Sequence, residues 1–231
     1  MIKEKNTELR NMFIGIGVIF LYFILSGYVY DFIRIFGINY NNLSTISKYI
    51  YLTLYQLLML VIIAFIYRKD FISNFKEFKS NIVLYIKKYI KYWIIALILM
   101  IISNIVISNF TTTFTSENNK AIINELKIAP LYILIVTIFI APILEELVFR
   151  LSFRKIFAHT NILYIILSGI FFGIIHVIGY LENINDLLFV IPYSIPGFIF
   201  AYTYTKSNNI FVPISLHLIH NLVMIIILIL I

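Results

Sequence analysis

The apolar residues of this 231-residue chain are grouped in long blocks that polar residues rarely interrupt. Each block has the length that an α-helix needs to cross a membrane, because about 20 residues span roughly 30 Å of hydrocarbon. The strands of a membrane barrel would instead alternate apolar and polar residues over about ten positions. Blocks of spanning length begin near Met12, Tyr51, Trp93, Leu131, Ile162, Leu187 and Ile210. The pattern therefore predicts an all-α, polytopic membrane helix bundle of about seven spans. No small-residue cleavage site follows the first block, so we expect it to be retained.

One polar segment between the second and third blocks has a helical pattern of its own. Residues 69–93 read KDFISNFKEFKSNIVLYIKKYIKYW, with apolar residues at steps of three and four and lysines between them. The apolar positions are Phe71, Phe75, Phe78, Ile82, Ile86 and Tyr89. This spacing predicts an amphipathic helix in the membrane interface, with its lysines over anionic lipid headgroups. A soluble loop is the alternative interpretation.

Composition and charge support a membrane protein and orient it. Hydrophobic residues make up 61% of the chain and the mean hydropathy is +0.97, which is too apolar for a soluble domain. With seven spans, 14 of the 18 Lys and Arg residues fall on the side of the N-terminus, and Arg34, Lys48, Lys120 and Lys127 fall on the other. The positive-inside rule then places the N-terminus in the cytoplasm. The net charge of +7 is explained by this topology, so no nucleic-acid partner is predicted.

The rest of the chain gives few further boundaries. Segment 111–120, TTTFTSENNK, is polar and predicts an irregular outer loop. We interpret residues 1–128 as N-terminal spans with the basic interfacial helix and residues 129–231 as a catalytic membrane core, within one integral domain. Cysteine is absent, which excludes disulfides and thiolate chemistry. The bias towards Ile, Asn, Lys and Tyr is typical of an AT-rich genome and suggests a bacterial cytoplasmic membrane.

Two carboxylates lie inside the fourth block, in the stretch APILEELVFR (residues 141–150). A charged group in the hydrocarbon core costs at least about 2.5–3.5 kcal/mol, so it usually faces a partner or a cavity and marks function. Glu146 and Arg150 are four residues apart, in the order that favours a salt bridge on one helical face. Glu145 points about 100° away and is left for another role. Pro142 removes one backbone hydrogen bond and should kink the helix, exposing a carbonyl beside Glu145. A purely architectural ion-pair cluster is the alternative.

The fifth block carries a histidine at a matching depth. In SGIFFGIIH, Gly169 and Gly173 permit close helix contact, and His176 follows nearly one turn later. If the chain turns at about Thr160, Glu145 lies 15 residues before the turn and His176 lies 16 after it. Antiparallel helices then bring both side chains to the same level. A lone membrane histidine can also serve only as an interhelical hydrogen-bonding group.

The last block contains HLIHN, in which His217 and Asn221 share a helical face and His220 is turned aside. Polar residues on a final span can simply join helices together. Considered with Glu145 and His176, however, they supply what amide hydrolysis needs. We expect Glu145 with His176 to activate water, and His217 with Asn221 to stabilise the oxyanion.

A zinc ion is the alternative to this metal-free chemistry. Glu145, His176 and His217 form a common three-ligand set for catalytic zinc, although the H-E-x-x-H motif is missing. We favour activation of water without a cofactor. The absence of Cys and of G-x-S-x-G argues against an acyl-enzyme.

Three motifs occur in order: Glu145-Glu146-x-x-x-Arg150, Phe172-x-x-x-His176 and His217-x-x-x-Asn221. With them the chain resembles, from about residue 130 to 225, the CPBP (Abi) family of CAAX proteases and bacteriocin-processing enzymes, relatives of type II CAAX prenyl endopeptidases. The resemblance implies an intramembrane protease, glutamate-type or metal-dependent, that cuts near the cytoplasmic side. It also implies that Glu145, His176 and His217 are essential and that Glu146, Arg150 and Phe172 support them. Leu151 departs from the family, whose members commonly have Gly there.

The implied partner is a peptide or protein substrate, lipidated or membrane-bound in some members of the family. Two other classes of function remain open. Glu/His relays and the interrupted segment IPYSIPGF, with Pro192, Pro196 and Gly197, are features of proton-coupled transporters. The bacteriocin association of the family also makes a non-catalytic immunity or scaffold protein an alternative.

Overall fold

The computed structural model describes residues 2–110 and 116–230, and it is all-helical over these residues. The longer helices are α1 (Ile2–Gly27), α2 (Thr45–Ile66), α3 (Arg68–Ser108), α4 (Glu117–Ile128), α8 (Asn161–Ile178), α9 (Val190–Ser207) and α10 (Phe211–Leu230). The fourth span is built from α5 (Pro130–Ile135), η3 (Val136–Ile140), α6 (Ala141–Glu146), η4 (Leu147–Ser152) and α7 (Phe153–Ile156). Short 3₁₀ turns are η1 (Phe32–Phe36), η2 (Tyr40–Asn42) and η5 (Ile184–Phe189).

The prediction of seven spans is confirmed. Within the described residues, seven helical segments are long and apolar enough to cross a membrane. They are Lys5–Gly27, Thr45–Ile66, Arg68–Ser108, Pro130–Ile156, Asn161–Ile178, Ile184–Ser207 and Phe211–Leu230. Many of their large apolar side chains face outward, as they must where lipid is the solvent. The protein is an all-α polytopic bundle.

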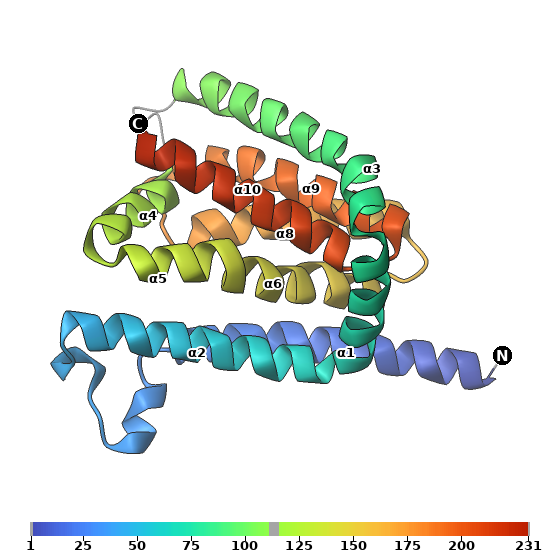
Figure 1. Cartoon of the computed structure of the whole chain (residues 1–231), viewed down its shortest axis with the longest axis horizontal. Coiled ribbons are helices and arrows are strands. Elements are labelled where there is room, and N and C mark those ends of the chain that lie inside the picture. The colour runs from blue at the N-terminus through green and yellow to red at the C-terminus, as the bar shows by residue number, and fades with distance from the viewer. Residues whose placement is uncertain (1, 111–115, 231) are drawn as a thin grey trace.

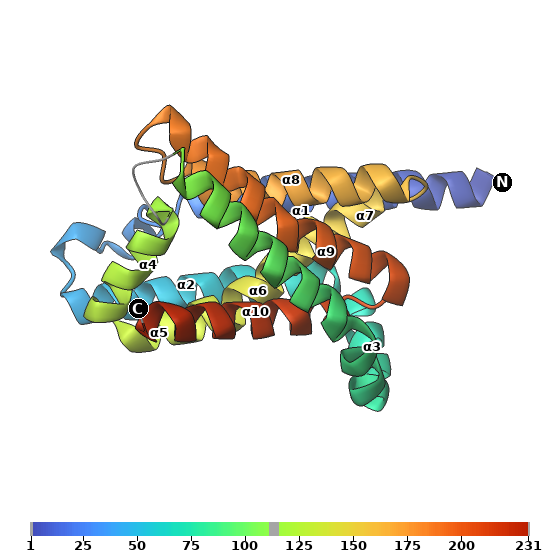
Figure 2. The same cartoon turned by 90° about the horizontal axis from the view of Figure 1, so that it is seen from above.

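The basic segments of the chain gather at one end of this bundle. The N-terminus, the α2–α3 junction, the α7–α8 turn and the α9–α10 turn all lie at the right in Figures 1 and 2. The α1–α2 connection, α4 and the C-terminal end of α10 lie at the other end (Figure 1). This arrangement agrees with the topology used to count the charges, in which successive loops alternate between the two sides of the membrane. A cytoplasmic location for the basic end stays a prediction.

The predicted interfacial helix forms, but it is continuous with the third span. Both belong to α3, which is interrupted only by the non-helical backbone of Asn81 (φ −127°, ψ 16°). The part before the bend runs crosswise to the other spans, at the basic end of the bundle (Figures 1 and 2). This is the direction that an interfacial helix takes. Contact with anionic lipid stays a prediction.

The expectation of an irregular loop at residues 111–120 is wrong for its second half. Ser116 caps α4 by accepting a hydrogen bond from the Asn119 N–H, and the helix begins at Glu117. Residues 111–115 lie outside the described part of the chain. The helix α4 lies beside α5, at the end opposite the N-terminus (Figure 1).

The fourth span is wound irregularly on either side of the two carboxylates. The π-helical stretches η3 and η4 flank α6, which carries Glu145 and Glu146. In η3, the Ala141 N–H donates to the carbonyl of Val136, five residues back. Pro142 follows without an N–H, so the Thr137 carbonyl lacks the donor that would continue this series. The disturbance expected at Pro142 therefore takes the form of π-helical winding that leaves one carbonyl available.

Close contact between α8 and α9 depends on glycine, as expected. A Cβ on Gly173 would lie 2.1 Å from Ser194 Oγ and 2.6 Å from the Val190 carbonyl oxygen. One on Gly169 would lie 2.1 Å from the Phe198 ring. The α9 helix itself runs unbroken through Pro196, so the interruption expected in IPYSIPGF does not occur. One of the two features that favoured a transporter is therefore absent from this helix.

We expect Gly173→Ala to destabilise the bundle by about 1–3 kcal/mol, because the added methyl group meets the Val190 carbonyl oxygen of the α9 backbone as well as the Ser194 side chain. The measurement is thermal unfolding of the purified protein in detergent. Gly17→Ala in α1 is the control, since nothing lies within 4 Å of its Cβ position. Equal melting temperatures for both variants would contradict the proposed packing.

Candidate active site

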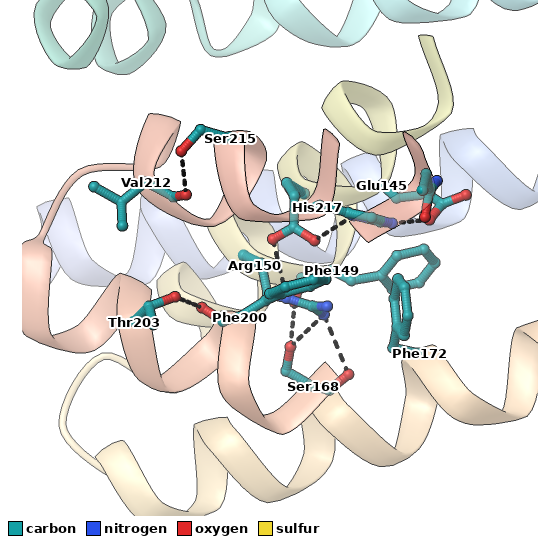
Figure 3. Close-up of polar contacts among 12 residues, drawn as sticks. Glu145, Phe149, Arg150, Ser168, Phe172, Phe200, Thr203, Val212, Ser215 and His217 are labelled. Carbon is teal, nitrogen blue, oxygen red and sulfur yellow. Dashed lines mark hydrogen bonds and ion pairs between the residues drawn. The ribbon is translucent and has the colours of Figure 1, made fainter. Parts of the chain in front are cut away.

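Three spans bring Glu145, His176 and His217 together. Glu145 Oε2 lies 3.9 Å from His176 Nε2 and 3.8 Å from His217 Nε2. The three side chains come from α6, α8 and α10, and Figure 3 shows Glu145 beside His217. The prediction that Glu145 and His176 lie at the same depth in the bundle is confirmed. The chain turns where expected, since α7 ends at Ile156 and α8 begins at Asn161.

The hydrogen bonds of the two imidazoles fix which ring nitrogen carries a proton. His176 Nδ1 lies 2.8 Å from the Phe172 carbonyl oxygen, and a carbonyl can only accept, so Nδ1 is the donor. His217 Nδ1 lies 3.0 Å from Glu146 Oε1 and donates to this carboxylate. In the neutral rings, each Nε2 therefore carries a lone pair.

When both rings are neutral, three electron-pair donors therefore face one another. They are both Nε2 atoms and Glu145 Oε2, which is buried and accepts no hydrogen bond within the described residues. Such an arrangement is unfavourable unless a proton, a water molecule or a cation lies among them. Separations of 3.8 and 3.9 Å are those at which one water can bridge both groups.

Beneath this group lies a buried ion pair. Glu146 and Arg150 are both 0% exposed, and Arg150 Nε lies 3.1 Å from Glu146 Oε2, as the four-residue spacing predicted. The guanidinium also donates to Ser168 Oγ at 3.0 Å and stacks 4.7 Å from the centre of the Phe172 ring. The Ser168 hydroxyl in turn donates to the Phe149 carbonyl (Figure 3). Because Glu146 is held by Arg150, it can orient His217 without leaving an isolated buried charge.

Asn221 has a hydrogen-bond partner that the sequence analysis did not predict. Its side-chain amide donates to the Thr137 carbonyl at 2.8 Å, and this is the carbonyl left available by the π-helical winding before Pro142. The residue therefore joins α10 to the fourth span, in addition to lining the same cavity as Glu145. Only its second N–H is free to meet an oxyanion.

Aromatic rings hold both imidazoles in position. The Phe172 ring lies 4.4 Å from that of His176 and 5.4 Å from that of His217, measured between ring centres. Phe200 stacks on His217 at 4.9 Å, and Tyr193 stacks on His176 at 5.1 Å. Sequence reasoning found Phe172 through its motif but missed Phe200, Tyr193 and Ser168, which have no motif in a chain with 17 Tyr and 21 Phe.

Tyr193 also connects the site to α4. Its hydroxyl lies 2.7 Å from Ser116 Oγ, accepts from Asn118 Nδ2 at 3.1 Å and donates to Asn119 Oδ1 at 3.2 Å. One residue of α9 thus contacts a catalytic candidate with its ring and the start of α4 with its hydroxyl.

A cavity of about 550 Å³ joins these groups. Glu145, His176, His217 and Asn221 line one part of it, and residues of α4 line another. His220 also lines the cavity, although it was expected to turn aside, and its buried Nδ1 has no hydrogen-bond partner within the described residues. A cavity of this size can accept part of an extended peptide.

The types of side chain at the site suit catalytic zinc, but they lie too far apart to bind it as three ligands. Each free Nε2 has a partner on its Nδ1, the arrangement seen around zinc-bound histidines. Ligands at bond lengths of 2.0–2.2 Å in a tetrahedral site lie roughly 3.4 Å apart. The distances from Glu145 exceed this, and no group of three ligating side chains in the described residues is close enough to hold a metal.

Comparisons with known proteins agree with the three motifs. Residues 127–223 match the family model described as "Type II CAAX prenyl endopeptidase Rce1-like". The "Putative membrane peptidase YdiL" of Bacillus subtilis (strain 168) is 36% identical over 108 residues, which cover 46% of this chain and 41% of that protein. An "Uncharacterized protein" of Mycoplasma capricolum is 28% identical over 240 aligned residues, or 93% of this chain and 68% of that protein. The match thus covers less than half of YdiL. No solved structure matches.

Proposed function

We propose that this chain is an intramembrane endopeptidase with Glu145 at its active site, because residues 127–223 match the family model of Rce1-like type II CAAX prenyl endopeptidases. The observation that carries the proposal is the position of the Glu145 carboxylate between two imidazoles whose Nε2 atoms face it. Such a group, buried inside a membrane bundle, can hold the water molecule that a hydrolase needs. The family also supports a peptide or protein as the substrate.

In the proposed mechanism, Glu145 and His176 activate a water molecule. A water in the gap of 3.9 Å donates one hydrogen bond to Glu145 Oε2 and one to His176 Nε2. Glu145 removes a proton as the water oxygen attacks the carbonyl carbon. When the intermediate collapses, the carbon–nitrogen bond breaks and Glu145 returns the proton to the leaving amine.

His217 is proposed to stabilise the oxyanion. Its Nδ1–H is donated to Glu146, so Nε2 can donate only when the ring is an imidazolium. In that form Glu146 accepts the hydrogen bond from Nδ1, and the positive charge of the ring faces the intermediate. The second N–H of Asn221 can add a weaker contribution.

Zinc is the alternative activator, and Glu145, His176 and His217 would be its ligands. Bound there, it would supply Lewis-acid activation of water. We favour metal-free hydrolysis because the Glu145–histidine distances are too wide for these three ligands at zinc bond lengths.

We expect peptide cleavage by the purified protein to survive thorough chelation, because the carboxylate and imidazole can hold the water themselves. The measurement is digestion of a peptide library in detergent, read by mass spectrometry with and without 1,10-phenanthroline, alongside metal analysis of the protein. Activity that is lost on chelation and restored by added Zn²⁺ would instead assign the metal-dependent mechanism.

We expect Tyr193→Ala to lower kcat by about 10²-fold, because His176 loses the ring that holds it in place. Tyr193→Phe keeps the ring and should restore most of kcat, which distinguishes positioning from the hydroxyl bonds to α4. The measurement is the rate of library-peptide cleavage, with kcat, KM and the pH profile recorded for each variant. Tyr202→Ala, on the same helix but outside the cavity, is the control. A Phe variant as impaired as the Ala variant would contradict positioning by the ring.

A further inference from the structure

Far from Glu145, the same cavity contains a second carboxylate, that of Glu125 on α4. Glu125 is half-buried, and no side-chain hydrogen bond or ion pair reaches it from the residues that the structure describes. Burial raises the pKa of its carboxyl group. The cations of α4 do not compensate it, since Lys120 pairs with Glu117 and Lys127 is exposed.

The wall of the cavity offers no permanently charged cation to this carboxylate. Among the described residues that line it there is no Lys or Arg, and its acidic residues are Glu125 and Glu145. An uncompensated carboxylate in a largely apolar cavity attracts a cation and repels an anion.

Tyrosine side chains line the cavity together with this carboxylate. Tyr132 and Tyr180 line the cavity with it, and Tyr132 is held by a hydrogen bond from Gln56 Nε2 at 3.3 Å. Partial burial, together with the negative charge of Glu125, raises the pKa of the Tyr180 phenol. A carboxylate beside aromatic rings is a common way to bind an ammonium or guanidinium group.

We propose that Glu125, Tyr132 and Tyr180 form a specificity subsite for a cationic side chain of the peptide substrate. This rests on the proposed peptidase function and adds a substrate class to it. The substrate is a peptide with Lys or Arg at a fixed distance from the bond that is cut.

The length of the fourth span gives that distance. Glu145 lies 13 residues after Tyr132, which corresponds to about 20 Å along the span at 1.5 Å per residue. An extended peptide covers about 3.3–3.6 Å per residue, so about six residues separate the cation from the scissile bond.

The test measures binding rather than cleavage, so it does not depend on catalysis. Glu145→Gln protein in detergent is titrated with fluorescent ten-residue peptides. Their sequences come from the peptide library, from peptides that the wild type cleaves where there are any. In each series, a single Lys, Gln or Glu is placed at every position in turn. We expect Lys to bind about ten-fold more tightly than Gln at one position, with Glu weakest. Adding Glu125→Gln should remove the preference, and Glu125→Arg should reverse it in favour of Glu. Glu182→Gln, at an exposed site outside the cavity, is the control and should keep it.

The outcomes separate the two proposals. A Lys preference that survives Glu125→Gln, no preference at any position, or no binding by any peptide overturns the subsite. A Glu125-dependent preference in a protein whose wild type cuts none of the peptides supports the subsite and contradicts the peptidase. Cleavage without a Lys preference supports the peptidase alone.

Discussion

Replacing Glu145 by Gln is expected to lower the rate of peptide cleavage by about 10²–10⁴-fold, the range that general-base catalysis contributes. Gln has nearly the same shape and cannot remove a proton from water. Because Glu145 Oε2 accepts no hydrogen bond from the described residues, the substitution breaks no such contact and the protein should stay folded. The measurement is cleavage of library peptides by purified protein in detergent, with melting temperature recorded in parallel.

The control for this prediction is Glu182→Gln, an isosteric change at an exposed site outside the cavity. It should leave cleavage unchanged. If Glu145→Gln cleaves as fast as the wild type, Glu145 is not the base. If neither protein cleaves while Glu145 supports proton flux in proteoliposomes, the transporter interpretation replaces the peptidase.

Removing Arg150 should have the largest effect on stability. Arg150→Met leaves the Glu146 carboxylate buried without its cation, and breaking a buried pair from one side costs about 3–5 kcal/mol. The double variant Glu146→Gln with Arg150→Met should recover part of this loss, because no charge then remains unpaired. The measurement is thermal or denaturant unfolding in detergent.

Arg34→Met is the matched control for the buried pair. Arg34 forms an exposed ion pair with Asp31 at 2.8 Å, and such pairs contribute about 0–1 kcal/mol. Its melting temperature should therefore change little. If Arg150→Met lowers the stability as little as Arg34→Met does, the buried cluster is not needed to hold His217 and the fourth span together.

The sequence predicted the parts of the site that depend on local geometry. The ion pair of Glu146 and Arg150 follows from helical spacing, and the shared level of Glu145 and His176 follows from counting residues on either side of one turn. The depth of His217 could not be counted in this way, because α10 is separated from the fourth span by two other spans. Its place was predicted only from its motif and is now given by the distance to Glu145.

Other features depended on packing that no local pattern encodes. The Thr137 carbonyl is available to Asn221 because the helix before Pro142 has π-helical winding. The sequence shows Pro142, but the spacing of apolar residues does not show this winding. The helix α4 was missed because its sequence, ENNKAIINELKI, is polar, although Ser116 before it is a typical N-cap residue. Tyr193 was missed because a stacking partner can come from any aromatic residue on a neighbouring span.

The most direct test of the site is a single turnover in oxygen-18-labelled water. With enzyme in excess over a cleavable peptide, attack by water held between Glu145 and His176 incorporates the label into the new carboxyl terminus and leaves the Glu145 carboxylate unlabelled. Mass spectrometry of the peptide products and of the protein fragment that contains Glu145 measures both. Label found in Glu145 would reveal a covalent intermediate on this carboxylate and contradict its role as a base.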